Sequence, residues 1–310
     1  MSRGDTLGVM TSPKPFRRSD ALSSGLSDSE IRRALRTGEL ERLAPGIYLD
    51  GPTAEGLDAT ERHRIRARTT GEGLPDGSAI SHVSAAVLHG LTLWRPDLSR
   101  VHVSRDGTSG GRRGTGRHLH VVHLGAGDVV EVDGVPCTSI ARTVADLACT
   151  APIDEVVIAG DSALARNPSL RAALAETFES LGRRQGIAAA RRVIAFLDGR
   201  SESPGESLSR LRMEQIGLPA PSLQEVVHTP EGEFVARTDF YWKEHRIVGE
   251  FDGMGKYGSA SPDVFRREKL REDALRDLGF HVIRWTWAEL SRFDVVRARF
   301  ERAIVRARRH

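Results

Sequence analysis

Residues 237–287 constrain the fold of this chain more than any other stretch. The pattern predicts a strand, a tight turn, a second strand, a long helix and a third strand. Asp239 lies on the first strand, and Glu250 and Asp252 lie on the second. Because side chains along a strand alternate between its two faces, Glu250 and Asp252 share one face. The hairpin is expected to fold Asp239 back toward this pair.

Three converging carboxylates need a compensating charge. Each pair repels by about 2 kcal/mol at about 7 Å and an effective dielectric constant near 20. We favour a divalent metal, Mg²⁺ (or Mn²⁺), with Asp239 and Glu250 as its ligands, since hard cations prefer oxygen donors. The alternatives are a bound proton, or ion pairs with Arg237, Arg284 or other arginines on the sheet face.

The spacing D-x10-E-x-D on a hairpin, followed by a helix and an R-W-T strand, resembles the PD-(D/E)XK nuclease superfamily. The branch similar to very-short-patch repair endonucleases fits best, over roughly residues 200–290. The resemblance implies a metal-dependent DNA endonuclease in which Glu206 completes the acidic site. The superfamily lysine, two residues after the glutamate, is here Asp252, so Lys256 or Lys269 would supply the positive charge.

Three further patterns belong to this region. Ser203, Pro204 and Glu206 form a helix-start signature, so Glu206 has a purely structural explanation beside the catalytic one. The helix 262–278 is expected to turn an apolar stripe inward. The strand that follows is apolar on both faces, which predicts a central position in the sheet. The members of the stripe are Leu270, Ala274 and Leu278.

Residues 16–50 predict a winged helix-turn-helix. Ser27 and Glu30 form a capping box that begins the second helix, and a hairpin is expected to turn at residues 44–46. The outer face of that helix carries Arg32, Arg33 and Arg36. In a winged helix-turn-helix this face enters the major groove of double-stranded DNA. A solvated basic helix face is the alternative.

The same segment, with its G-x-L-x-R-L-x-x-G-x-Y core, resembles the N-terminal domain of AbiEi-type antitoxins. The core residues are Gly38, Leu40, Arg42, Leu43, Gly46 and Tyr48. The resemblance implies a DNA-binding autorepressor with a cognate toxin as a possible partner, and it adds Arg42 to the DNA-binding residues. A looser likeness continues to about residue 150.

The loop at residues 105–118 is rich in glycine and arginine. It lacks the G-K-[ST] ending of a phosphate-binding loop, so a mobile hairpin tip is the default interpretation. Contact with the DNA backbone through Arg112, Arg113 and Arg117 is the alternative.

The histidines of the region 56–150 do not predict a metal site. His82 and His89 are seven residues apart on one helix face, and we interpret them as core or hydrogen-bonded side chains because no third ligand is evident. His118, His120 and His123 do not share one strand face, which argues against a metal cluster there.

The 310 residues suit several domains. We predict a multidomain α/β (α+β) protein: a tail at 1–15, a winged helix at 16–55, an α+β domain at 56–150, a helical spacer at 151–199, and a restriction-endonuclease-like mixed sheet flanked by helices at 200–310. The net charge of +3 does not by itself indicate nucleic acid. Two cysteines favour a reducing cytoplasm, and no run approaches the roughly 18 apolar residues of a membrane span.

Two functions therefore compete. The first is a metal-dependent endonuclease that the winged helix delivers to DNA. The second is an AbiEi-like transcriptional regulator or antitoxin whose nuclease-like domain is inactive.

Overall fold

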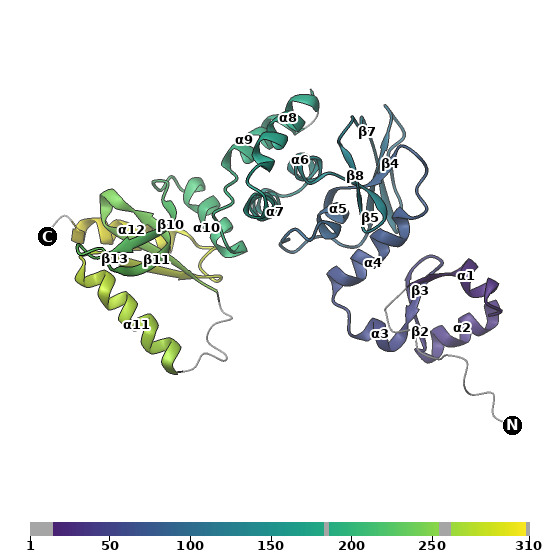
Figure 1. Cartoon of the computed structure of the whole chain (residues 1–310), viewed down its shortest axis with the longest axis horizontal. Coiled ribbons are helices and arrows are strands. Elements are labelled where there is room, and N and C mark those ends of the chain that lie inside the picture. Colours follow the sequence, from purple (N-terminus) through teal and green to yellow (C-terminus); the bar gives the residue numbers. More distant parts are fainter. Residues whose placement is uncertain (1–14, 183–185, 254–261, 308–310) are drawn as a thin grey trace. The chain divides into compact units, whose positions relative to one another are not determined.

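The computed structural model describes residues 15–182, 186–253 and 262–307, and Figure 1 shows its helices and strands. The chain divides into two compact units. Unit 1 comprises Met1–Thr150 and Ala172–Ile187, and unit 2 comprises Ala151–Arg171 and Ala188–His310. None of the described helices is both long enough and apolar enough to span a bilayer.

Unit 1 begins with a small sheet and two helices. Its strands lie in the order β1-β3-β2. The elements are β1 (Phe16–Arg17), α1 (Arg18–Ser23), α2 (Asp28–Thr37), β2 (Leu40–Ala44) and β3 (Ile47–Asp50).

The capping box predicted for α2 is confirmed. The Ser27 hydroxyl accepts the Glu30 N–H at 3.3 Å, and the Glu30 carboxylate accepts the Ser27 N–H at 2.8 Å. Gly38 ends the helix at φ 77°, a left-handed conformation that costs glycine little. The inner face of α2 packs through Ile31 against Ala21 and Tyr48.

The rest of unit 1 is built around a six-stranded mixed sheet with the order β6-β7-β5-β4-β9-β8. Helices α4 and α5 pack on the sheet, and α6 packs on α5. The bounds are α3 (Gly51–Glu55), α4 (Ala59–Gly71), β4 (Ser78–Ile80), α5 (His82–Leu88), β5 (Val101–Asp106), β6 (Arg112–Arg113), β7 (Arg117–Val122), β8 (Val129–Val132), β9 (Val135–Thr138), α6 (Ile140–Thr150) and α8 (Leu170–Ser180).

Unit 2 is built around a four-stranded sheet with the order β10-β11-β12-β13, in which β12 and β13 are parallel and the other pairs are antiparallel. A parallel pair needs a crossover connection, and α11 lies in that connection. The bounds are α7 (Ile153–Arg166), α9 (Ile187–Phe196), α10 (Pro204–Gln215), β10 (Ser222–His228), β11 (Phe234–Trp242), η1 (Lys243–His245), β12 (Ile247–Asp252), α11 (Pro262–Asp277), β13 (His281–Thr286) and α12 (Asp294–Ala307).

Helices cover both faces of this sheet. Trp285 donates its indole N–H to Ser209 of α10 at 2.7 Å, and Trp242 packs against Phe300 of α12. On the opposite face, Leu275 of α11 packs against Val248. The side-chain alternation predicted for β12 is therefore confirmed, with Val248 on the α11 face.

Helix α7 belongs to unit 2 because a buried ion pair joins it to α10. Asp161 accepts Arg210 at 3.0 Å, the Ser207 hydroxyl at 2.7 Å and the Asp198 N–H at 2.7 Å. Both partners of the pair are buried. The segment predicted as a spacer is thus divided between the two units.

Two expectations for this region are wrong. Leu270 is 62% exposed, whereas Leu275 is 1% exposed. The predicted stripe is therefore wrong at Leu270, although its last member, Leu278, packs against the buried core. The inward face of α11 also includes the charged residues Glu268 and Arg271, which reach the sheet. Apolar spacing alone could not reveal them. The strand β13 lies at the edge of the sheet, and its two apolar faces are explained by the helices on both sides.

Candidate functional site

The acidic residues of unit 2 lie where β12 runs beside β13. The register pairs Glu250 with Arg284 and Asp252 with Thr286. The Arg284 guanidinium is 2.8 Å from Glu250 and 3.5 Å from Asp252. Both carboxylates therefore point to the same face of the sheet, as the alternation along the strand predicts.

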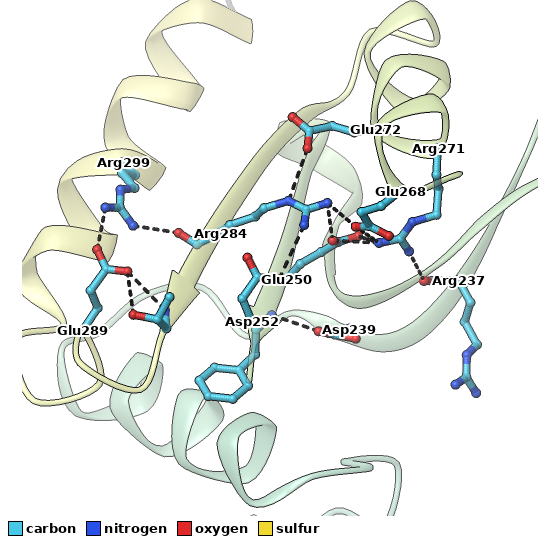
Figure 2. A network of polar contacts seen from close by, with 12 residues as sticks. Arg237, Asp239, Glu250, Asp252, Glu268, Arg271, Glu272, Arg284, Glu289 and Arg299 are labelled. Carbon is cyan, nitrogen blue, oxygen red and sulfur yellow. Dashed lines mark hydrogen bonds and ion pairs between the residues drawn. The ribbon is translucent and has the colours of Figure 1, made fainter. Parts of the chain in front are cut away.

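Glu250 is held by two arginines, as Figure 2 shows. It is 5% exposed, and it accepts hydrogen bonds from Arg271 of α11 at 2.8 Å to both oxygens. Glu268 accepts from the same two guanidiniums, and Glu272 lies 3.3 Å from Arg284. Four carboxylates and two guanidiniums thus form one network on the α11 face.

Burial has the largest effect on the pKa of the Glu250 carboxyl. It raises the pKa of this carboxyl to about 7, although Arg271 and Arg284 favour the charged form. The neighbouring charges of Glu268 and Asp239 add to the rise. A carboxylate that is this poorly solvated depends on its arginine partners to remain ionised.

Asp239 lies at the point where the β11–β12 ladder ends. The last paired residues are Phe240 and Gly249, and beyond them the Asp239 carboxylate accepts the backbone N–H of Phe251 at 2.9 Å. Its negative charge raises the pKa of both Glu206 and Glu250. Asp239 therefore influences the protonation of both Glu206 and Glu250.

Glu206 has a structural role in the first turn of α10. Its N–H donates to the Ser203 hydroxyl at 3.2 Å, and its carboxylate accepts from that hydroxyl, from the Glu202 N–H and from the Gln224 amide. Ser203 is the N-cap, as predicted, but the return bond goes to Glu202. Burial, followed by the charge of Asp239, raises the pKa of Glu206.

Among the described residues, the positive charges that contact Glu250 and Asp252 belong to arginines. Lys256 lies outside the described residues, and Lys269 is exposed on α11. Arg271 was missed from the sequence, whereas Arg284 was foreseen as an alternative partner. Arg237, the other arginine considered, pairs with Glu202 at 2.6 Å.

The arginines predicted to bind DNA lie on the surface of unit 1. Arg32, Arg33 and Arg36 are exposed on α2, and within the described part of the chain no ion pair engages them. Arg42 of β2 is exposed too, as are Arg112 and Arg113 of β6. An exposed cluster of arginines attracts polyanions.

His118, His120 and His123 do not all share one strand face, as expected, but two of them lie in a cluster of histidines that the sequence did not predict. His118 and His120 do share a face of β7, and they meet His102 of β5 and His82 of α5. Only His123 points elsewhere and contacts Asp106. His89 bonds the Thr138 carbonyl at 2.7 Å, as expected of a hydrogen-bonded histidine.

Comparison with known proteins identifies the N-terminal segment. Residues 11–49 match the family of AbiEi antitoxin transcriptional regulators. The match covers β1, α1, α2, β2 and most of β3, and so includes the exposed arginines of α2 and β2. It supports a DNA-binding transcriptional regulator or antitoxin. The looser likeness to residue 150 stays a prediction.

The other similarities are partial. The chain is 41% identical over 105 residues to the uncharacterized proteins Rv2248 and MT2308, from two strains of Mycobacterium tuberculosis. That alignment spans 34% of this chain and 37% of those relatives. The crystal structure of the Mycobacterium tuberculosis protein RV2827C is similar with a TM-score of 0.40 and 17% identity, covering 71% of this chain and 85% of that one.

Proposed function

We propose that this chain is a DNA-binding transcriptional regulator that reads double-stranded DNA with the AbiEi-like segment, folded as a winged helix-turn-helix. The match at residues 11–49 carries the proposal. In this proposal α2 is the recognition helix and the β2–β3 hairpin is the wing. Side chains near the start of a recognition helix contact base edges, while flanking arginines contact phosphates.

The two faces of α2 support this assignment. Ile31 is 3% exposed and anchors the helix on Ala21 and Tyr48, so the helix has a rigid support. Arg32, Arg33 and Arg36 remain exposed to a ligand. Rigid presentation of several guanidiniums is what bidentate contact with phosphates and guanines requires.

Footprinting of the full chain on the DNA upstream of its own gene tests the proposal. The change Arg32→Ala with Arg36→Ala is expected to abolish the footprint. The matched control is Arg191→Ala with Arg192→Ala, two exposed arginines of α9, which removes the same charge elsewhere and should leave the footprint intact. Equal affinity of the wild type and the α2 variant would refute the role of α2.

A cognate toxin is the partner that an antitoxin requires. Co-expression with the product of the neighbouring gene, followed by purification of the complex, tests this part of the proposal. A stable complex that neutralises a toxic neighbour is the expected result. Failure of the neighbour to bind would leave a regulator without an antitoxin role.

The acidic residues of unit 2 support a second candidate, a PD-(D/E)XK-like endonuclease. The order of α10, β10, β11, β12, α11 and β13 is compatible with that fold, and the charge of Asp239 acts on Glu206 and Glu250. Two observations favour an inactive domain instead. Asp252 stands at the usual lysine position, and Arg271 and Arg284 already occupy Glu250.

A divalent ion would therefore have to compete with two guanidiniums for Glu250. Cleavage of plasmid, single-stranded and mismatched DNA with Mg²⁺ or Mn²⁺ distinguishes the two candidates. We expect the wild type to cleave these DNAs no faster than the double variant Asp239→Ala, Glu250→Ala does. Metal-dependent cleavage that both single variants abolish would establish the endonuclease.

A further inference from the structure

Four histidines from three elements of unit 1 gather on one face of the six-stranded sheet. β5 and β7 are parallel, and their register pairs His102 with His118 and Ser104 with His120. Since residues two apart on a strand share a face, His118 and His120 lie on the same face as His102. His82, the first residue of α5, stacks on His120 with ring centroids 3.8 Å apart.

The nitrogen atoms of three of these rings are close enough to hold one ion. One ligand atom from each of His82, His102 and His120 lies within 4.8 Å of the other two. His120 Nε2 is 3.1 Å from His102 Nδ1. Two nitrogen ligands of a tetrahedral zinc ion, with bonds of about 2.0–2.1 Å, lie roughly 3.3 Å apart. The His102–His120 pair already has that separation.

The support of His82 also resembles that of a metal ligand. Its Nδ1 lies 3.0 Å from the Ser81 hydroxyl, and such outer contacts orient ligating imidazoles. The residue is 2% exposed and has φ 51°, a conformation that non-glycine residues adopt at some cost and that often marks a functional position.

We propose that His82, His102 and His120 form a binding site for a divalent transition metal, with Zn²⁺ as the expected ion. Three imidazoles suit zinc and its neighbours in the periodic table better than Mg²⁺ or Ca²⁺. The bound ion would tie α5 to β5 and β7. A set of three histidines also leaves one position of a tetrahedral ion open to water or another ligand. This site consists wholly of unit 1 residues and is independent of the carboxylates of unit 2.

The test uses the full chain without a polyhistidine tag, stripped with a chelator. Titration with Zn²⁺ by calorimetry should give one ion per chain, and Co²⁺ should give the visible absorption of a tetrahedral complex. His120→Phe keeps an aromatic ring against His82 but offers no ligand nitrogen. Its affinity should fall by more than the roughly 10–100-fold loss that removal of an outer contact causes. His102→Gln is the second ligand variant, and its affinity for Zn²⁺ should fall as that of His120→Phe does.

His123→Phe is the matched control, since His123 follows β7 and its side chain is 83% exposed. It should bind Zn²⁺ as the wild type does, and thermal unfolding without metal shows that each variant is folded. If the wild type takes up no Zn²⁺, or if folded His120→Phe binds it with unchanged affinity, the histidines are a packed cluster of neutral rings and the proposal is overturned.

Discussion

Glu250 and Arg284 face each other in direct register on the parallel strands β12 and β13, and their side chains meet at 2.8 Å. The guanidinium contacts a carboxylate that the sequence suggested as a ligand of a divalent cation. Arg271 reaches the same carboxylate from α11. Fixed positive charge from the protein therefore neutralises the most buried carboxylate of the acidic cluster, which is why we place DNA binding before DNA cleavage.

Loss of Arg284 should destabilise unit 2. Arg284→Ala leaves Glu250 buried with one partner fewer, and breaking a buried pair typically costs about 3–5 kcal/mol. Because Arg284 is partly exposed, we expect the lower end of that range. Urea denaturation followed by tryptophan fluorescence measures the loss, since Trp242, Trp285 and Trp287 all lie in unit 2.

The effect of Arg284→Ala should depend on pH. The pKa of Glu250 is raised to about 7 in the folded state, so its contribution to stability is complete below the unfolded pKa and is lost as pH rises through 7. Without Arg284 more stability is lost as pH rises. The difference in free energy of unfolding between the variant and the wild type should therefore be larger at about pH 8 than at about pH 5. Arg276→Ala, which removes a more exposed partner of Glu272, should show a small effect at both values. A large effect independent of pH would contradict this account.

Gly205 should tolerate no side chain. A Cβ atom there would lie 1.9 Å from the ring of Phe251, and the ring is held by Trp287 at a centroid distance of 5.0 Å. Gly205→Ala is expected to lower the melting temperature of unit 2, at a cost of about 1–3 kcal/mol from overpacking. Gly253→Ala, where the nearest atoms are 3.9 Å away, is the control. Equal melting temperatures for the two variants would show that the Phe251 ring moves freely.

His63 should make unit 1 sensitive to acid. The imidazole is buried between the Leu98 carbonyl at 3.1 Å and the Ser84 hydroxyl at 2.8 Å, and burial lowers its pKa to about 4. Its contribution is present above the unfolded pKa and is lost as pH falls through 4, by about 3 kcal/mol in total.

Denaturation of unit 1 between about pH 7 and pH 4 measures the slope of its free energy of unfolding against pH. His63→Gln should flatten it, and the exposed His123→Gln should leave it unchanged. This trend has the opposite sign to the one expected for Glu250 in unit 2. An unchanged slope in His63→Gln would assign the acid sensitivity to other groups.

The arginines of α2 should determine how salt weakens DNA binding. Each phosphate contact contributes about 0.9 to the slope of log affinity against log salt concentration. Arg32→Ala with Arg36→Ala should therefore lower the magnitude of the slope by about 2 if both contact phosphates. Fluorescence anisotropy over a salt series measures it. An altered base preference with an unchanged slope would mean that these arginines read bases instead.

Much of the local structure could be predicted because it depends on residues close together in the chain. The capping box of Ser27 and Glu30 involves a three-residue spacing, and the sharing of one face by Glu250 and Asp252 follows from the geometry of a strand. The basic outer face of α2 could be identified for the same reason. Helix α11 shows the limit, because its inward face mixes charged and apolar residues and its apolar spacing pointed to Leu270.

The sequence by itself determined the starts of α2 and α10, the β2–β3 hairpin, the exposed arginines of α2 and the shared face of Glu250 and Asp252. Only the tertiary structure decided which charges meet. Arg271 and Arg284 are 21 and 34 residues from Glu250 in the numbering, and strand register and the crossover helix bring them to it. The same holds for His82, His102 and His120, because pairing of β5 with β7 and the packing of α5 depend on burial of a shared core, which no local pattern encodes.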